Sequence, residues 1–276
     1  MSSTGSGRRS FTVSRRHRTG VDTGGSFADV LPDWKGRGEV WLFISPHDDD
    51  IVAGGGLLLQ KAVEDGVRIS VRITTNGDMG YCSLSDRDRI VEIRRDETLE
   101  SFGLYGITDV EWLGFSDNDL YRYAGRRAAV EDDPSVIAGY TGIQNAYTHL
   151  LRSVRPSRVF VPGRADYHPD HKLVYQEVLI SIFHAGGAIW PELGAPLEAL
   201  PSVYEMAVYC AFEENPDIKV KGGPEHLETK IRALQAYRSQ KQIGSVIVSM
   251  REAGPVEYVR DIGYRLYSPS LYEGLF

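Results

Sequence analysis

The stretch Val40–Gly56 does most to limit the folds open to this chain. It starts with an apolar run, Val40–Ile44, that breaks at Ser45-Pro46, and then come His47 and three consecutive aspartates. Three glycines, 54–56, open a further apolar segment. A short apolar run bounded by a proline turn predicts a buried strand, and the segment after the glycines predicts a helix. Ligands bind at the carboxyl ends of strands in open α/β sheets, so His47 and the aspartates stand where a site is expected.

Strand and helix patterns alternate along the rest of the chain. This alternation predicts an α/β fold with a doubly wound, mostly parallel sheet and helices on both faces. The expected strands are 40–44, 67–75, 109–113, 158–162 and 203–212, and the expected helices are 54–65, 86–102, 135–154, 172–183 and 225–240.

Three segments are predicted to lack regular structure. Residues 1–30 are rich in Ser, Thr, Gly and Arg, which predicts a disordered N-terminal tail, and residues 31–276 are expected to form a single domain. The charged segment Tyr121–Asp133 is expected to be irregular. Ala185–Ser202 carries three prolines among Gly and Ala, and we expect a long surface loop that serves as a lid or a substrate wall.

The charge balance of the chain argues against nucleic acid as a partner. The 276 residues carry a net charge of −7, and residues 1–30 hold five Arg and two Asp, so that segment contributes +3 and the remainder carries −10. A body that acidic repels a phosphate backbone. No apolar run approaches the ~18 residues of a transmembrane helix. The two cysteines, Cys82 and Cys210, have no zinc or redox spacing, so a reducing, cytoplasmic location is expected, while a single disulfide and a homo-oligomer stay open.

The acidic turn after Pro46 also has a simpler interpretation. Polar residues after a strand commonly form a solvated turn, and an aspartate there can cap the following helix. Three adjacent carboxylates repel one another, however, which predicts a positive group that neutralises them. A second cluster, Asp166–His171, follows the expected strand 158–162 and holds two of the seven histidines. Both clusters fall at the same edge of the predicted sheet.

The two clusters together supply the ligands of a divalent metal. His47, Asp50 and His171 give two imidazoles and one carboxylate, a set that catalytic zinc sites combine with an open position for water. Such an ion lowers the pKa of its bound water and polarises a carbonyl. The sequence therefore predicts a metal site with these three ligands.

Three further residues of the clusters are candidates for catalysis. Asp49 is left as a free carboxylate beside the metal and is the candidate general base. His168 would stabilise an oxyanion or protonate a leaving group. Asp170 would orient His168 by hydrogen bonding its other ring nitrogen.

At these residues the sequence resembles the N-acetylglucosaminyl-phosphatidylinositol deacetylase family, also called LmbE-like or PIG-L-like. The family motifs H-P-D-D-E and H-x-x-H stand here as HDDDI at residues 47–51 and HPDH at residues 168–171. The similarity extends in order over roughly residues 38–245. It implies a Rossmann-like fold, a divalent metal that is most often Zn²⁺ with Fe²⁺ as an alternative, and the same roles for the residues of both clusters.

Other family-like positions supply candidate substrate contacts. Arg94 stands in a segment that looks like the family's arginine-to-glutamate helix signature, and Asp117 and Asp119 lie in a segment like its third strand loop. Two positions depart from the family pattern. Asp48 replaces a proline and adds a charge beside the ligands, whereas Ile51 replaces a glutamate and removes one.

The resemblance implies a metal-dependent hydrolase that removes an N-acetyl group from an N-acetylglucosamine-type amino sugar or its conjugate. Two other classes stay open from the residues alone. One is a non-catalytic carbohydrate-binding or metal-binding relative, and the other is a non-haem iron oxygenase, which also uses two histidines and one carboxylate. The residues do not identify the small-molecule or glycoconjugate substrate, nor the native metal.

Overall fold

The computed structural model describes residues 10–275. Its main sheet is built from β1 Thr12–His17, β2 Gly20–Gly24, β3 Val40–Ser45, β4 Arg68–Thr75, β5 Val110–Phe115, β8 Arg158–Pro162, β9 Ser202–Met206, β10 Ile218–Lys221 and β11 Val256–Asp261. These nine strands lie in the order β2-β1-β10-β11-β9-β8-β3-β4-β5. A separate small pair is formed by β6 Arg127–Ala128 and β7 Tyr140–Thr141.

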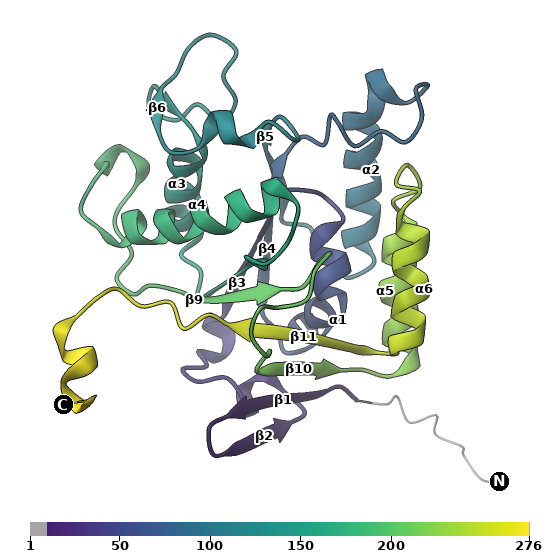
Figure 1. Ribbon diagram of the computed structural model, residues 1–276, viewed down its shortest axis with the longest axis vertical. Coiled ribbons are helices and arrows are strands. Elements are labelled where there is room, and N and C mark those ends of the chain that lie inside the picture. The colour runs from purple at the N-terminus through teal and green to yellow at the C-terminus, as the bar shows by residue number, and fades with distance from the viewer. Residues whose placement is uncertain (1–9, 276) are drawn as a thin grey trace.

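Helices cover both faces of the main sheet (Figure 1). They are α1 Asp50–Glu64, α2 Ile90–Gly103, α3 Ile143–Val154, α4 Pro169–Gly186, α5 Pro224–Gln235 and α6 Ile243–Ala253. One face carries α1, α2 and α5, with α6 packed on α5, and the other carries α3 and α4. Among residues 10–275, none of the helices has the length and apolar character needed to cross a bilayer.

The predicted α/β fold is confirmed, and the parallel part of the sheet matches the prediction closely. Strands β9, β8, β3, β4 and β5 are neighbours and run parallel. The other half of the sheet was not predicted. It consists of β1, β2, β10 and β11, which pair antiparallel and extend the sheet beyond β9. The fold therefore joins a doubly wound parallel half to an antiparallel half.

The apolar run of β3 is buried on both faces because successive side chains point to opposite sides of a strand. Trp41 and Phe43 pack in the core under α1 and α5, and Leu42 and Ile44 pack in the core under α3 and α4. All four side chains are 0% exposed. This double burial explains why the strand reads as a continuous apolar run rather than as an alternating one.

The disordered tail predicted for residues 1–30 is wrong over residues 10–30. This segment forms β1 and β2, and β1 pairs with β10 at the edge of the main sheet. Phe11, Val13 and Phe27 are buried in the core that lies under α1. Residues 1–9, the rest of the predicted tail, lie outside the described residues. The domain boundary predicted at residue 31 thus falls inside a continuous fold.

Helix α1 differs from the predicted helix 54–65 in its start and in its shape. It begins at Asp50, and its backbone leaves helical geometry at Gly55 (φ −145°). The carboxylate of Glu257 in β11 accepts hydrogen bonds from the backbone N–H groups of Leu57 and Leu58, at 2.8–2.9 Å. Glu257 therefore caps the second part of α1 as an N-terminal residue would cap a helix. Its charge is paired with Lys230 of α5.

The predicted helix 135–154 is correct only from residue 143. Gly139 and Gly142 adopt left-handed backbone conformations (φ +82° and +109°), and a right-handed helix cannot continue through residues with positive φ. The segment before α3 contains β7 and turns instead.

The expectation that the Ala185–Ser202 loop is a lid or substrate wall is not met. Its start is held by Arg152 of α3, whose guanidinium donates to six main-chain carbonyls, those of His184, Ala185, Gly187, Ile189, Trp190 and Gly194. Leu193 and Leu197 of the loop are buried. The loop is thus packed on α3 and α4, and none of its described residues lines the cavity discussed next.

Candidate active site

Loops from five strand ends meet at one edge of the parallel half of the sheet. They follow β3, β4, β5, β8 and β9 and enclose a cavity of about 140 Å³. The cavity is lined by His47, Asp49, Met79, Gly80, Arg94, Asp117, Asn118, His168, Tyr209, Gln240 and Gln242. The sequence clusters at 47–50 and 166–171 therefore meet at the carboxyl ends of strands, where α/β sheets bind ligands.

The turn that carries His47 is fixed by hydrogen bonds to its main chain. Thr75 of β4 donates to the carbonyl of Pro46 (2.8 Å), and Ser45 donates to the carbonyl of His47 (2.7 Å). Asp50 begins α1 and accepts from the backbone N–H of His47 (2.9 Å). The turn thus holds His47 and the side chain of Asp50 in a fixed relation.

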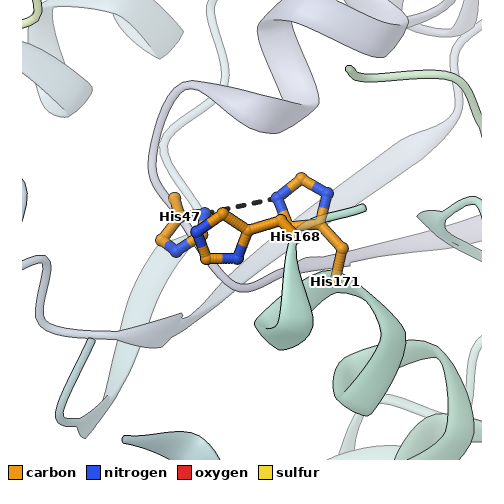
Figure 2. Close-up of side chains that lie close together, drawn as sticks. All are labelled: His47, His168 and His171. Carbon is orange, nitrogen blue, oxygen red and sulfur yellow. Dashed lines mark hydrogen bonds between the residues drawn. The ribbon is translucent and has the colours of Figure 1, made fainter. Parts of the chain in front are cut away.

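The second cluster is positioned by the start of α4. His168 is the N-cap residue, Pro169 takes the first helical position, and His171 falls in the first turn. This local geometry turns both imidazoles towards His47. Figure 2 shows the three rings gathered together, with the ring nitrogens of His47 and His171 facing each other.

Three side-chain atoms stand at the spacing of metal ligands. Nδ1 of His47 lies 3.2 Å from Oδ2 of Asp50, Nε2 of His171 lies 3.2 Å from the same oxygen, and the two nitrogens are 3.3 Å apart. Ligands about 2.0–2.1 Å from a tetrahedral zinc are about 3.3–3.4 Å from one another. The other oxygen of Asp50 is buried and has no hydrogen-bond partner among the described residues. These residues fit a divalent cation.

The outward nitrogens of both histidines face carboxylates, as metal-binding histidines commonly do. Nε2 of His47 lies 3.0 Å from Asp117 and 3.6 Å from Asp170. Nδ1 of His171 lies 3.1 Å from Asp166. Each carboxylate would hold a proton on the nitrogen that it faces and leave the other nitrogen free to bind a cation.

Two other groups of residues also gather within ligand distance. They are the three histidines of Figure 2 and the set of His47, Asp117 and Asp170, each with candidate ligand atoms within 4.8 Å of one another. The set of His47, Asp50 and His171 has nearly equal separations of 3.2–3.3 Å. It also leaves Asp117 and Asp170 to orient the ring of His47, so we favour it.

The three candidate ligands influence one another's charge. Burial alone would lower the pKa of both histidines, but the neighbouring carboxylates outweigh it. The pKa of His47 is raised well above its usual value, chiefly by Asp50, and that of His171 is raised to about 9 by Asp50 and Asp166. Burial would raise the pKa of Asp50, but the two histidines hold it well below its usual range. The pocket thus stabilises positive charge beside Asp50.

Asp49 stands apart from the ligand set and lines the cavity. Its nearest cation is Arg94 of α2, with Nη2 at 3.5 Å from Oδ1. Burial raises the pKa of Asp49, and the charge of Arg94 only partly offsets this effect. A carboxylate with a raised pKa in a cavity is suited to accept a proton and later return it.

His168 faces the cavity with one ring nitrogen already engaged. Its Nδ1 accepts a hydrogen bond from the backbone N–H of Asp170 (3.3 Å). Burial and the positive charges of His47 and His171 lower its pKa. The neutral ring therefore carries its proton on Nε2, and that N–H is the donor it can offer to a substrate.

Two predicted roles need correction. Asp170 does hydrogen-bond the second ring nitrogen of His168, but with its backbone N–H, because its carboxylate lies near His47 and accepts from the backbone N–H of Asn118 (2.9 Å). Only the main chain of Asp170 contacts the ring of His168. Asp119, a candidate substrate contact, does not line the cavity and pairs with Arg122 at the surface. The structure does place the other two candidates, Arg94 and Asp117, on the cavity wall.

Several residues of the site carried no prediction. Asp166 contacts His171 and also accepts from the backbone N–H groups of His168 and Tyr209, at 3.0–3.1 Å. Asp78 accepts from the backbone N–H of Asp117 (2.8 Å). Asp166 precedes the H-x-x-H motif by two positions, and Asp78 follows a strand end, so both had a positional signal. Tyr209 lies beyond the end of β9 and had none.

Comparison with known proteins agrees with this geometry. The sequence profile of a family described as PIG-L: GlcNAc-PI de-N-acetylase matches residues 42–182, which include both clusters. This matched stretch spans the strands β3, β4, β5 and β8 and four of the helices that surround them.

Two curated proteins and one solved structure illustrate the similarity. The chain is 26% identical over 230 residues to 1D-myo-inositol 2-acetamido-2-deoxy-alpha-D-glucopyranoside deacetylase 2 of Saccharopolyspora erythraea, covering 72% of this chain and 82% of the relative. It is 26% identical over 210 residues to a probable N-acetyl-alpha-D-glucosaminyl L-malate deacetylase 2 of Bacillus cereus, covering 73% and 83%. The crystal structure of a conserved protein from Thermus thermophilus, TT1542, superposes with a TM-score of 0.63 at 25% identity, covering 83% of this chain and 97% of that one.

Proposed function

We propose, because this chain belongs to the GlcNAc-PI de-N-acetylase family, that it hydrolyses the N-acetyl group of an N-acetylglucosamine-type amino sugar or its conjugate with the help of a divalent metal. The observation that carries the proposal is the triangle formed by His47 Nδ1, Asp50 Oδ2 and His171 Nε2, with sides of 3.2–3.3 Å. Of the three residues, His47 lines the cavity that also presents Asp49 and His168, and Asp50 and His171 are buried next to it.

The three ligands would hold the cation, and Zn²⁺ suits this mixture of nitrogen and oxygen donors. When bound, the ion would supply Lewis acidity, which lowers the pKa of water and polarises the acetyl carbonyl. Asp117 and Asp166 would keep the two imidazoles in the tautomers that bind it.

Asp49 would move the proton in this reaction. As the attacking water adds to the acetyl carbon, Asp49 accepts one of its protons. When the C–N bond breaks, the same carboxyl returns that proton to the departing nitrogen, so the products are acetic acid and a free amine, which become acetate and an ammonium group after a proton passes between them. Burial raises the pKa of Asp49, which suits a group that must both take and release a proton.

His168 would stabilise the negative charge that develops on the acetyl oxygen. Its Nδ1 is engaged by the backbone N–H of Asp170, so Nε2–H is the donor directed to a substrate. A fixed donor of this kind favours the tetrahedral transition state over the planar amide.

The two open alternatives are less well supported. A binding module without activity needs no carboxylate beside the metal ligands, and Asp49 is present and lines the cavity. An iron oxygenase would share the ligand types, but the family match favours hydrolysis. A cytoplasmic location and Zn²⁺ as the native ion are part of the proposal, as is a glycoconjugate substrate of the type that the names of the relatives describe.

The test combines metal content with acetate release. We would purify the wild type, the His171→Ala variant and a His149→Ala control, and measure bound metals by mass spectrometry. His149 is a matched control because it lies on α3 and contacts Leu193, away from the cavity. Acetate release would then be measured on a panel of N-acetylglucosamine conjugates with added Zn²⁺ or Fe²⁺.

We expect close to one metal ion per chain in the wild type and the control, and loss of both metal and acetate release in His171→Ala. Metal binding without acetate release from any member of the panel would refute the proposed reaction. Wild-type protein that takes up no metal after reconstitution would refute the site itself. Oxygen consumption with Fe²⁺ in place of acetate release would point to the oxygenase class.

A further inference from the structure

Arg94 is the only Lys or Arg that lines the cavity within the described part of the chain. Its side chain is 3% exposed and reaches the site from α2. A buried guanidinium facing a sugar-binding cavity is the group that would recognise a phosphate or carboxylate on a substrate, because it offers several fixed donors and a full charge. Whether it does so depends on which groups already neutralise it.

Two carboxylates of the acidic turn already contact this guanidinium. Nε lies 3.4 Å from Oδ2 of Asp48, and Nη2 lies 3.5 Å from Oδ1 of Asp49. Burial alone would lower the pKa of Arg94, but the charges of Asp48, Asp49 and Asp117 raise it. Asp48, Asp49 and Arg94 thus form a group of two carboxylates and one cation.

Asp48 is built into this arrangement without reaching the cavity. It is 0% exposed and does not line the cavity wall. The hydroxyl of Thr98 donates to its carboxylate (3.2 Å), and the hydroxyl of Tyr237 donates to its main-chain carbonyl (2.8 Å). Asp48 therefore affects a substrate indirectly, and Arg94 is the cavity-lining side chain with which it forms an ion pair. The proline that the family pattern has at this position carries no charge.

We propose that Asp48 sets the substrate selectivity of the cavity by neutralising Arg94, so that the site accepts uncharged amino sugars and their uncharged conjugates and disfavours those with a phosphate or carboxylate on the sugar. This inference rests on the proposed deacetylase function and deepens it. Asp48 is a positioning residue in this scheme, since it touches Arg94 and not the substrate. Of the conjugates named for the two relatives above, the inositol glycoside is the uncharged kind and the malate glycoside is the anionic kind.

The experiment compares neutral and anionic substrates across four proteins. The substrates are N-acetylglucosamine and N,N'-diacetylchitobiose, which are uncharged, and N-acetylglucosamine 1-phosphate and 6-phosphate, which place a charge at two different ends of the sugar. The proteins are wild type, Asp48→Asn, the double variant Asp48→Asn/Arg94→Gln and Thr98→Val. Thr98→Val is the matched control, because it removes a hydrogen bond to Asp48 and keeps both charges.

We expect wild type to favour the neutral sugars. Asp48→Asn should raise the ratio of anionic to neutral kcat/KM about tenfold to a hundredfold, mainly through a lower KM for the phosphorylated sugar. A hydrogen bond to a charged group changes an affinity by about this factor. The double variant removes one charge of each sign and should return to the wild-type ratio. Thr98→Val should keep the wild-type ratio.

Two results would overturn the inference: an Asp48→Asn variant that folds and keeps the wild-type ratio, and a wild type that already favours the phosphorylated sugars. The second result needs no variant, so the inference stays testable even when Asp48→Asn fails to fold. Calorimetric binding of glucosamine and glucosamine 6-phosphate to wild type and Asp48→Asn separates this inference from the proposed function. Absence of turnover on all four substrates would refute the reaction, while a gain of phosphate-dependent binding in Asp48→Asn would still support the role of Asp48 and no gain would refute it.

Discussion

Gly80 and Arg94 are packed so closely that a methyl group on Gly80 would lie 1.9 Å from Nη1 of Arg94. We therefore expect Gly80→Ala to push Arg94 away from the acidic turn or to shift the loop after β4. The free energy of unfolding should fall by about 1–3 kcal/mol, as overpacking does elsewhere, and acetate release should fall with it. Urea unfolding and the deacetylation assay would measure these effects.

The control for this change is Gly103→Ala at the end of α2. A Cβ on Gly103 meets nothing within 4 Å, so this variant should be neutral or slightly more stable. Equal stability of the two alanine variants would contradict the close packing of Gly80 on Arg94.

Replacement of the candidate base should separate chemistry from metal binding. Asp49→Asn keeps the size of the side chain and removes its ability to accept a proton. We expect kcat to fall by roughly 10²–10⁴-fold while the metal content stays at the wild-type level. Asp96→Asn, an exposed change two residues after Arg94, is the control and should keep full activity. Unchanged turnover in Asp49→Asn would rule out the base assignment.

His168 is expected to act in the transition state rather than in substrate binding. His168→Gln should lower kcat by about 10²–10³-fold, the usual cost of a lost oxyanion donor, and leave KM and metal content nearly unchanged. Steady-state kinetics on the active conjugate would measure both constants, with His149→Ala as the control. A rise in KM at constant kcat would show instead that His168 binds the ground state.

The parallel half of the fold could be predicted from sequence because each of its strands is an apolar run followed by a helix pattern. The antiparallel half gave no such signal. Strand β2 is almost fully exposed and polar, and β1 lies in a segment rich in Ser, Gly and Arg with few large apolar residues. Strand β1 pairs with β10, more than 190 residues away in sequence, and β2 pairs with β1. Local sequence patterns do not report a pairing over that distance.

The site shows the same division between local and distant information. His168 and His171 lie at one helix start, so their spacing alone predicts that they act together. The neutralising cation for the acidic turn was expected in general terms, and Arg94 supplies it for two of the three carboxylates. Asp119 was misassigned because position after a strand does not say which way a side chain points. Its own neighbour, Arg122, pairs with it.

The ion pair of Glu39 and Arg158 predicts a dependence of stability on pH. Burial would raise the pKa of Glu39, but hydrogen bonds from Ser157, Lys35 and Trp41, together with the charge of Arg158, lower it. A carboxyl whose folded pKa is depressed stabilises the fold above its unfolded pKa of about 4.3 and loses that effect as the pH falls through the folded pKa. Acid should therefore remove the contribution of this pair.

Glu39→Gln tests this contribution. At pH 7 the variant should be less stable than wild type by about 3–5 kcal/mol, because the buried charge of Arg158 loses its partner. Below about pH 4 the difference should shrink, because the unfolded chain then binds a proton at Glu39, and it should be lost below the lowered pKa that Glu39 has in the folded protein. Urea unfolding of both proteins from pH 7 to pH 3 would measure the difference, and a gap that stays constant with pH would contradict the assignment.

Because Glu257 of β11 caps the second part of α1, we expect it to stabilise the helix that carries Asp50. Glu257→Ala should lower the free energy of unfolding by about 3–5 kcal/mol, because Lys230 and the N–H groups of Leu57 and Leu58 lose a buried partner. Glu228→Ala, which breaks an exposed pair with Arg251, should lower the stability far less, because solvent screens the exposed charges. Thermal and urea unfolding would compare the two variants. Similar losses in both would show that Glu257 is not a cap.

The position of Glu257 also sets an order of events during synthesis. The ribosome releases the turn with His47 and the first part of α1 early, but the carboxylate that caps the second part lies 200 residues later. A nascent chain that ends before β11 thus has all its proposed metal ligands and no cap for the helix behind them. Productive metal loading would then be a late event, after the C-terminal strand has been translated and has joined the sheet.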